Sequence, residues 1–501
     1  MSKSIWPKAD PKRVAAALSG HGALGLAAAA LIYILCISGV LSVFNHELQR
    51  WEQPGAPAME KADPAAVQKA AETLLAAQEN PTSHFYVQLP TYDLPRMVLT
   101  TDAGAVFADE EGGIAEKESH PWTQFVLDLH YYLHVPGTLG LTLVGFLGVI
   151  LLGLALSGFL AHPRIFRDAF TFRFGRNAQL TQADIHNRLS VWTSPFLISS
   201  ALTGAMLGLA GVVSGVIAAV EYEGDIAAVY APVFGDEPEE NERPAPLADI
   251  AAALHYVEMQ YPHTDPVYVI MHEPQTAGQH LQILAEHPER LIFGDYYNFD
   301  AGGAFVENVG MADGHIGQQV AASAYRLHFG SFGGMPIKAA YALFGLALAA
   351  IIAAGMNIYF LKRRERARAA PRLEAMWTAV VWGAPAALAL TLVLSVTGLA
   401  SGRALVTAFW APLSLLTLAA AVSADKTATA IACRVAAGGL TAGGVALHGL
   451  AQASAFSAPA VFGVNIAGGA FAVMLIAPDA ARFANRLRRS ERQRAPAAPA
   501  E

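Results

Sequence analysis

Long apolar runs alternate with polar stretches along this chain. A helix needs about 20 apolar residues to cross the hydrocarbon core of a bilayer. Eight segments meet that length: 21–44, 139–161, 189–211, 338–361, 376–399, 404–423, 428–450 and 457–477. The pattern predicts a polytopic α-helical membrane protein with about eight transmembrane helices.

Two long polar segments, 45–137 and 212–337, have other periodicities. In the first, residues 64–79 have the spacing of an amphipathic helix, and HFYVQL and RMVLTTDAGAVFADEEG are typical of strands joined by a turn. In the second, residues 246–260 predict a helix, followed by strands in VYVIMH, HLQILAE and LIFGDYYNFDAGGAFVEN. Each segment is therefore expected to form a small α+β domain.

Composition and charge agree with a membrane protein and indicate its orientation. The chain of 501 residues is 54% hydrophobic and 15% charged, with a net charge of −8. Its basic residues gather in 164–188, 362–372 and 482–494, which lie on one side of the membrane when eight spans are counted. The positive-inside rule makes that side cytoplasmic, so both termini are expected in the cytoplasm and both polar segments outside it. The sequence has no basic patch with interleaved aromatic residues of the kind that binds nucleic acid.

The expected organisation follows from these boundaries. It comprises 1–44 (cytoplasmic N-terminus and first span), 45–137 (first outer domain), 138–211 (second span, basic loop, third span), 212–337 (second outer domain), 338–372 (fourth span and basic loop), 373–478 (four accessory spans) and 479–501 (basic cytoplasmic tail). The first run is too long for a signal peptide core and is interpreted as a retained anchor.

A histidine motif occurs twice. His21 and His186 are each followed, after sixteen residues, by a Ser/Thr-Gly pair that ends in Gly39 and Gly204. Eighteen residues make five helical turns, which would place each glycine on the face of its histidine, about 27 Å along the helix. The repeat predicts a duplicated core.

A second pair of histidines completes the repeat. Leu129-His130 precedes the second span, and Leu327-His328 precedes the fourth. Both halves cross in the same direction, and the interface of such parallel repeats is a common place for a site. His21 and His186 would then lie at the cytoplasmic boundary, with His130 and His328 at the outer one.

Two histidines from two helices at one level form the ligand set of a six-coordinate haem. Two levels predict two haems of the b type, because the chain has no Cys-x-x-Cys-His motif. Gly39 and Gly204 would then leave clearance for the outer macrocycle. Zinc is less favoured, since it usually takes three or four protein ligands.

Several alternatives stay open at this level. His134 and His46 compete with His130 as the outer ligand. Arg188 and Arg326 flank two of the histidines and are candidates for haem propionates, or else ordinary interfacial arginines. The glycines are equally compatible with close helix packing. No catalytic residue is assigned.

Four stretches carry a family resemblance. LSVFNHELQRWEQP, LDLHYYLHVPGTLG, ADIHNRLSVW and LHFGSFGGMPIKAAYALFGL resemble the PepSY-associated transmembrane family over about residues 15–365. The resemblance implies that the polar segments are two PepSY-like domains in the periplasm of a bacterial inner membrane. Some members look like inner-membrane reductases of ferric siderophores that carry two haems. Residues 374–477 depart from the minimal pattern of the family by adding four spans.

The leading hypothesis is a di-haem electron-transfer protein that reduces a periplasmic ferric siderophore or similar iron chelate. No Gly-x-Gly-x-x-Gly or P-loop motif is present, so the electron donor is expected to be a quinol or a separate reductase. One alternative is a PepSY binding or regulatory protein without redox activity, anchored in membrane lipid. Another is a transporter, although the spans lack the midplane charges of a substrate path.

Overall fold

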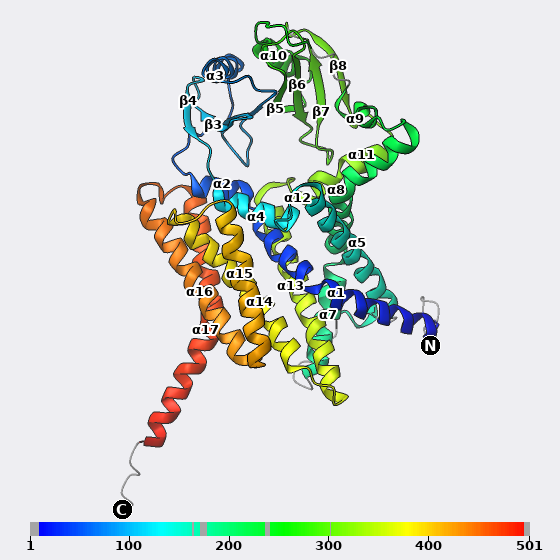
Figure 1. The fold of residues 1–501 in the computed structure, drawn as a ribbon, viewed down its shortest axis with the longest axis vertical. Helices are drawn as coiled ribbons and strands as arrows, with labels where there is room; N and C mark the ends of the chain where they lie inside the picture. Colours follow the sequence, from blue (N-terminus) through cyan, green and yellow to red (C-terminus); the bar gives the residue numbers. More distant parts are fainter. Residues whose placement is uncertain (1–9, 163–164, 171–177, 236–240, 301, 495–501) are drawn as a thin grey trace, which may run out of the picture.

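The fold is a layer of long helices with a β-sheet domain on one side of it (Figure 1). The computed structural model describes residues 10–162, 165–170, 178–235, 241–300 and 302–494. Within these ranges eight helices are long and apolar enough to cross a membrane, as the hydropathy pattern predicts. They are α1 (Pro11–Ser42), α5 (Gly137–Ala161), α8 (Ser194–Glu221), α13 (Gly334–Glu365), α14 (Pro371–Val396), α15 (Arg403–Ser423), α16 (Lys426–Ala451) and α17 (Pro459–Arg494).

Shorter helices join these elements. They are α2 (Asn45–Glu52), α3 (Pro64–Ala76), α4 (Pro121–Tyr132), α6 (Ile165–Asp168), α7 (Ala178–Trp192), α9 (Ile226–Phe234), α10 (Ile250–Gln260), α11 (Ile316–Ala322), α12 (Ala324–Phe329) and the 3-10 turn η1 (Ala453–Ala455). Of these, α2, α4 and α12 lie where the sheet domain meets the long helices (Figure 1).

The two polar segments build one sheet rather than two separate domains. Its strands are β1 (His84–Gln88), β2 (Met97–Thr101), β3 (Gly104–Ala108), β4 (Ile114–Lys117), β5 (Asp265–His272), β6 (His280–Glu286), β7 (Asp295–Phe299) and β8 (Phe305–Gly310). Their order is β4-β3-β2-β1-β5-β6-β7-β8, so the two halves meet where β1 pairs with β5.

The seam between the halves is a regular antiparallel ladder. Phe85 lies opposite Met271, and Val87 lies opposite Val269. All four side chains are buried in one core with residues of α3 and α10. Without this pairing, β1 and β5 would each expose an edge of unpaired backbone groups, which explains why two half-sheets join.

The predicted third span differs from the structure in its local course. Helix α7 ends at Trp192 and α8 begins at Ser194, because Pro195 in the first turn of α8 has no N–H to donate. Hydrogen bonds from Thr193 N to Leu189 O (2.9 Å) and from Leu197 N to Thr193 O (2.8 Å) keep the two helices in succession. His186 and the glycine eighteen residues later are therefore on two helices, unlike the single-helix stripe expected.

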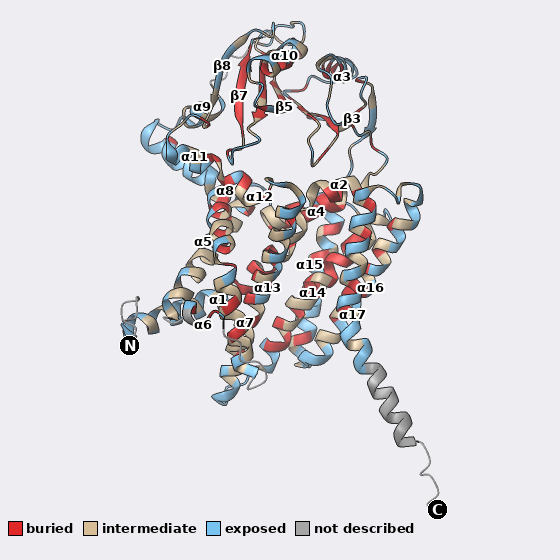
Figure 2. Cartoon of the chain, turned by 180° about the vertical axis from the view of Figure 1, so that it is seen from behind, coloured by how far each residue is buried: buried red, intermediate tan, exposed pale blue. Residues whose placement is uncertain are grey.

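The last four long helices form a bundle on one side of the molecule (Figure 1). Many residues of α14 are buried (Figure 2), and several of them belong to one core with residues of α1, α2, α4 and α15. We call α14–α17 the accessory bundle.

Candidate functional site

The four histidines of the repeat occur as two pairs. His21 on α1 and His186 on α7 have ring centroids 6.0 Å apart, with ring planes at 79°. His130 on α4 and His328 on α12 have centroids 6.2 Å apart, with planes at 23°. We call His130 and His328 the sheet-side pair and His21 and His186 the far-side pair.

Each far-side ring is held through its Nδ1. His21 Nδ1 lies 3.0 Å from the carbonyl oxygen of Leu154 on α5 and 3.2 Å from Ser157 Oγ. His186 Nδ1 lies 2.8 Å from the carbonyl oxygen of Ile351 on α13. A carbonyl only accepts, so Nδ1 carries the proton on both rings and Nε2 is the nitrogen with a free lone pair.

The sheet-side rings repeat this arrangement. His130 Nδ1 lies 3.0 Å from the carbonyl oxygen of Leu35 on α1 and 3.3 Å from Ser38 Oγ. His328 bonds to the backbone of Ser200 on α8, and its Nδ1 lies 3.1 Å from Thr203 Oγ1. Among the described residues, no hydrogen bond to the Nε2 of any of the four rings is formed.

Four glycines make room for the four rings. A Cβ built on Gly39 or Gly204 would stand 2.8 Å from Cε1 of His130 or His328, and one on Gly355 would stand 3.1 Å from Cε1 of His186. A Cβ on Gly158 would lie 3.4 Å from Cε1 of His21. Each glycine follows by four residues the carbonyl that holds the same ring, so one turn of helix supplies both contacts.

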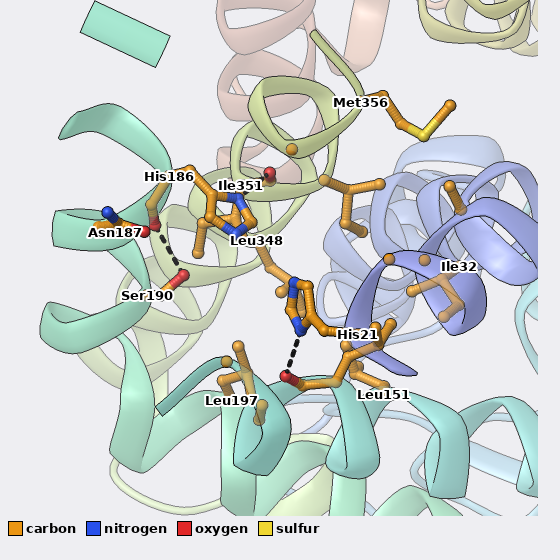
Figure 3. A pocket seen from close by; sticks show the side chains of 18 of the residues that line it. His21, Ile32, Leu151, His186, Asn187, Ser190, Leu197, Leu348, Ile351 and Met356 are labelled. Carbon is orange, nitrogen blue, oxygen red and sulfur yellow. Dashed lines mark hydrogen bonds between the residues drawn. The ribbon is translucent and has the colours of Figure 1, made fainter. Parts of the chain in front are cut away.

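Each pair lies in the wall of its own cavity. The far-side cavity has about 970 Å³ of empty space and a mainly apolar lining (Figure 3) that includes Leu151, Leu348, Ile351, Met356 and Tyr359. The sheet-side cavity has about 1270 Å³ and is richer in aromatic side chains. Its aromatic lining residues are Tyr131, Phe196, Tyr325, Phe329 and Tyr341.

The two competing histidines have other surroundings. His134 uses both ring nitrogens: Nε2 lies 3.0 Å from the carbonyl oxygen of Phe125, and Nδ1 accepts from Trp410 Nε1 at 3.2 Å. His46 lies on α2, beyond the end of α1, and the charges beside it include Lys338 and Asp93. Neither belongs to the lining of the sheet-side cavity, whereas His130 does.

The two arginines are paired with protein groups. Arg188 is buried and forms an ion pair of 2.8 Å with Asp184 on the same helix. Arg326 donates to the Glu286 carboxylate, and its Nη1 donates to the carbonyl oxygens of His287 and Arg290 at 3.1 and 2.8 Å. Arg326 thus fastens α12 to the sheet domain. Both guanidinium groups thus bind protein partners, and these contacts give no support for their binding to haem propionates.

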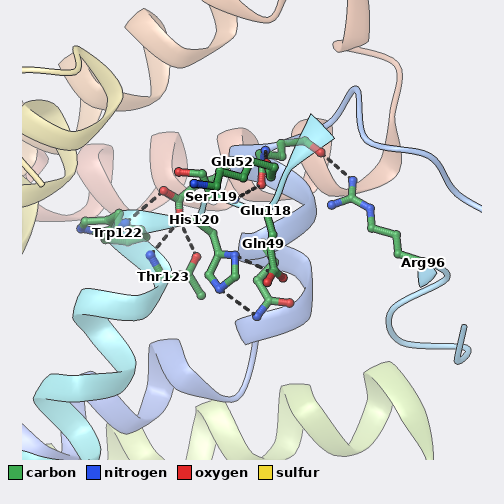
Figure 4. A network of polar contacts seen from close by, with 10 residues as sticks. Gln49, Glu52, Arg96, Glu118, Ser119, His120, Trp122 and Thr123 are labelled. Atoms are coloured by element: carbon green, nitrogen blue, oxygen red, sulfur yellow. Dashed lines mark hydrogen bonds and ion pairs between the residues drawn. The ribbon is translucent and has the colours of Figure 1, made fainter. Parts of the chain in front are cut away.

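A polar network fastens α4 in a similar way (Figure 4). The Glu52 carboxylate accepts from the backbone N–H groups of Trp122 and Thr123 at 3.0 and 2.7 Å, which satisfies donors in the first turn of α4. Beside it, His120 contacts Gln49 and Glu118. Burial, and then the charge of Arg96, lowers the pKa of His120 to about 4, so this imidazole is neutral at pH 7.

Each pair can give two imidazole nitrogens to one metal. Among the described residues, no three His, Cys, Asp or Glu side chains converge as a set for a bare metal ion. Two ligands suffice for a metal that brings the rest of its coordination sphere with it. The sequence drew attention to the four histidines and to Gly39 and Gly204, but it missed Gly158 and Gly355. The Ser-Gly pair of residues 157–158 repeats the motif and was a usable signal, whereas Gly355 follows an alanine.

Comparison with known proteins identifies the family. Residues 18–363 match the family described as PepSY-associated TM region. The chain therefore belongs to this membrane-protein family, as the motifs at the ends of the first four spans predict. A curated relative from Pseudomonas aeruginosa, an uncharacterized protein, is 35% identical over 118 residues. That alignment covers 24% of this chain and 30% of the relative, and it ends well short of the length of either.

Proposed function

We propose that the chain is a b-type di-haem protein that carries electrons across the membrane to an acceptor on the sheet side. The observation that supports this most is the spacing of the rings. Imidazole nitrogens bind metal ions at about 2.0–2.1 Å, so two rings whose centres lie only a few ångströms further apart than two such bonds could both hold one metal ion. The observed separations are 6.0 and 6.2 Å.

The protonation pattern fits the same cofactor. Ligating histidines usually donate their second N–H to a backbone carbonyl or carboxylate, which orients the ring and selects the tautomer. Here Leu154, Ile351, Leu35 and Ser200 supply those carbonyls. A bound haem would supply one-electron chemistry. The backbone carbonyls hold the rings, and the apolar cavity walls exclude water from them.

We propose the sidedness from the charge pattern. The basic loops would face the cytoplasm, and the sheet domain would lie in the periplasm of a bacterial inner membrane. Electrons would then enter from a quinol or a separate reductase near the far-side pair. They would leave from the sheet-side pair to a ferric siderophore or a similar iron chelate, whose hard oxygen donors hold iron(II) less tightly than iron(III).

Tyr325 marks the place where such an acceptor would approach. It lines the sheet-side cavity and is 50% exposed. Its ring packs against Phe329 with a centroid distance of 4.4 Å and a tilt of 35°, and the Phe329 centroid is 5.7 Å from that of His328. An acceptor resting on Tyr325 is thus two ring contacts from the sheet-side pair.

A visible spectrum of the purified full-length protein tests the cofactor. The reduced-minus-oxidised difference should show a b-type α band, and chemical analysis should give two haems per chain. A protein expressed with ample haem supply that shows no such band would refute the proposal and favour a binding or regulatory role for the sheet domain.

A kinetic experiment tests the acceptor site. Tyr325→Ala should slow re-oxidation of the pre-reduced protein by a ferric trihydroxamate while leaving haem content unchanged. Tyr92→Ala is the matched control, since Tyr92 is 90% exposed and lies outside the cavity lining. Equal rates in the two variants would show that the acceptor does not use this surface.

A further inference from the structure

The accessory bundle lies beyond the family match, and its contacts fall on one half of the core. Among the described residues, hydrogen bonds join it to α1, α2 and the first turn of α4. They run from Tyr33 Oη to Val381 O (2.9 Å), from Trp51 Nε1 to Asn465 Oδ1 (3.0 Å), from Trp122 Nε1 to Thr391 Oγ1 (3.2 Å) and from His448 Nε2 to Trp51 O (2.8 Å). His448 also stacks on Trp51 with a centroid distance of 3.8 Å.

The helices of the second half meet the bundle through the ion pair of Arg364 with Glu374, next to the chain connection.

One more contact reaches the other end of α4. Trp410 Nε1 on α15 donates to His134 Nδ1 at 3.2 Å, and His134 Nε2 donates to the carbonyl of Phe125 at 3.0 Å. An indole N–H can only donate and a carbonyl can only accept, so His134 is the neutral Nε2–H tautomer. The imidazole stacks on Phe125 at 4.6 Å, and Phe125 packs on the fully buried Phe409 of α15.

The backbone at His134 needs such support. Leu133 and His134 have φ values of 51° and 58°, in the left-handed region that residues with a Cβ rarely adopt. Their N–H groups bond to Leu129 O (3.2 Å) and Asp128 O (3.3 Å), which closes the last turn of α4. Side-chain contacts that engage both nitrogens of His134 offset the strain of this turn.

His130 lies in that last turn, one helical turn before His134. Its own side chain is held from α1, by the Leu35 carbonyl and against Gly39. The accessory bundle holds α4 at both of its ends, through Trp122 and His134. We propose that Trp410 and His134 are positioning residues: through them the accessory bundle sets the place of the sheet-side histidine His130. The cofactor in this inference comes from the proposed function, whereas the positioning of His130 rests on the contacts of α4 alone.

Carbon monoxide binding to the reduced, haem-loaded full-length protein is the first test. A haem with two histidine ligands does not bind carbon monoxide until one ligand leaves. His134→Ala should make about half of the haem, one of two sites, reactive with carbon monoxide, and Trp410→Phe should give a smaller reactive fraction. Trp382→Phe is the matched control, because Trp382 lies in the same bundle against Arg434.

The second test does not need haem. Spin labels at Gln124→Cys on α4 and Met335→Cys on α13 occupy exposed positions near the sheet domain, and both native cysteines are buried. Trp410→Phe should broaden the distance distribution between the labels, and Trp382→Phe should not. Unchanged distances together with unchanged carbon monoxide binding overturn the inference. Broadened distances in a protein that never binds haem support the positioning and refute the proposed cofactor instead.

Discussion

The far-side and sheet-side pairs share one way of holding a histidine and differ in almost everything around it. In both pairs, the ring forms a hydrogen bond to a backbone carbonyl, and the glycine one helical turn after that carbonyl leaves room for the ring. The far-side rings are near perpendicular and come from the long helix α1 and the shorter α7, in a cavity lined mainly by aliphatic residues. The sheet-side rings are near parallel and come from the short helices α4 and α12, among aromatic residues.

The difference lies in what fixes the helices. Arg326 ties α12 to the sheet domain, and Glu52 caps α4. The sheet-side pair therefore depends on the sheet domain and, through Trp410, on the accessory bundle. The far-side pair depends on the packing of α1 against α5 and of α7 against α13. The two pairs therefore have the same kind of ring contacts and different supports.

Removing one ring at a time should have the largest effect. His21→Ala and His186→Ala should each lose the same haem, and His130→Ala and His328→Ala should each lose the other, so every variant retains about half of the haem. Redox titration of the single variants identifies which component is missing. If His21→Ala and His328→Ala eliminated the same component, the pairing across halves would be wrong.

Filling the glycine positions should have a graded effect. Gly39→Ala and Gly204→Ala bring a Cβ to 2.8 Å from a ring carbon and should displace the sheet-side ligands, whereas Gly158→Ala meets its ring at 3.4 Å and should be nearly neutral. The measurement is the fraction of low-spin haem in each variant. Equal losses from Gly158→Ala and Gly39→Ala would contradict the contacts described.

If each pair holds a haem, the ring planes should give the two cofactors different electron paramagnetic resonance spectra. The far-side rings, with planes at 79°, would give a highly anisotropic low-spin signal. The sheet-side rings, with planes at 23°, would give a rhombic signal. The oxidised protein should show both signals, and His328→Ala should remove the rhombic one. Two identical rhombic signals would remove this distinction between the pairs.

Acidification should lower the stability of the protein through the His120 network beside α4. This effect should be smaller than those of the substitutions above. His120 beside α4 has its pKa lowered to about 4, whereas an unfolded histidine titrates near about 6.5. Between these pH values the unfolded chain binds the extra proton, so stability falls as the pH falls, by at most about 3 kcal/mol. Burial raises the pKa of Glu118, which opposes part of this loss.

The midpoint of thermal unfolding measured at pH 7 and pH 5 tests this support. His120→Gln should lose less stability on acidification than the wild type, because the amide does not titrate. His255→Gln, at an exposed position of α10, is the control and should behave as the wild type does. If His120→Gln lost as much stability on acidification as the wild type, the acid response would not come from this network.

Much of the fold followed from local pattern. The eight long helices could be predicted because the bilayer selects length and apolarity, which are properties of a continuous stretch of chain. The strands and helices of the polar segments followed from their short periodicities. The joining of the two halves could not be predicted, because β1 and β5 are separated by some 180 residues and by two long helices. The break at Thr193 was signalled by Pro195, although hydropathy alone concealed it.

The candidate site, like the fold, has features that the sequence predicts and features that depend on tertiary packing. By itself the sequence determined that four histidines recur at equivalent places in two halves, since a repeat is visible wherever residue types and spacings recur. The repeat also predicted that His21 pairs with His186 and His130 with His328. Only the tertiary structure decided which ring nitrogen is engaged, and that His134 contacts Trp410 while His130 lines the cavity. The physical reason is that ring orientation depends on a carbonyl and a glycine of a neighbouring helix, and helix packing brings those groups together from distant parts of the chain.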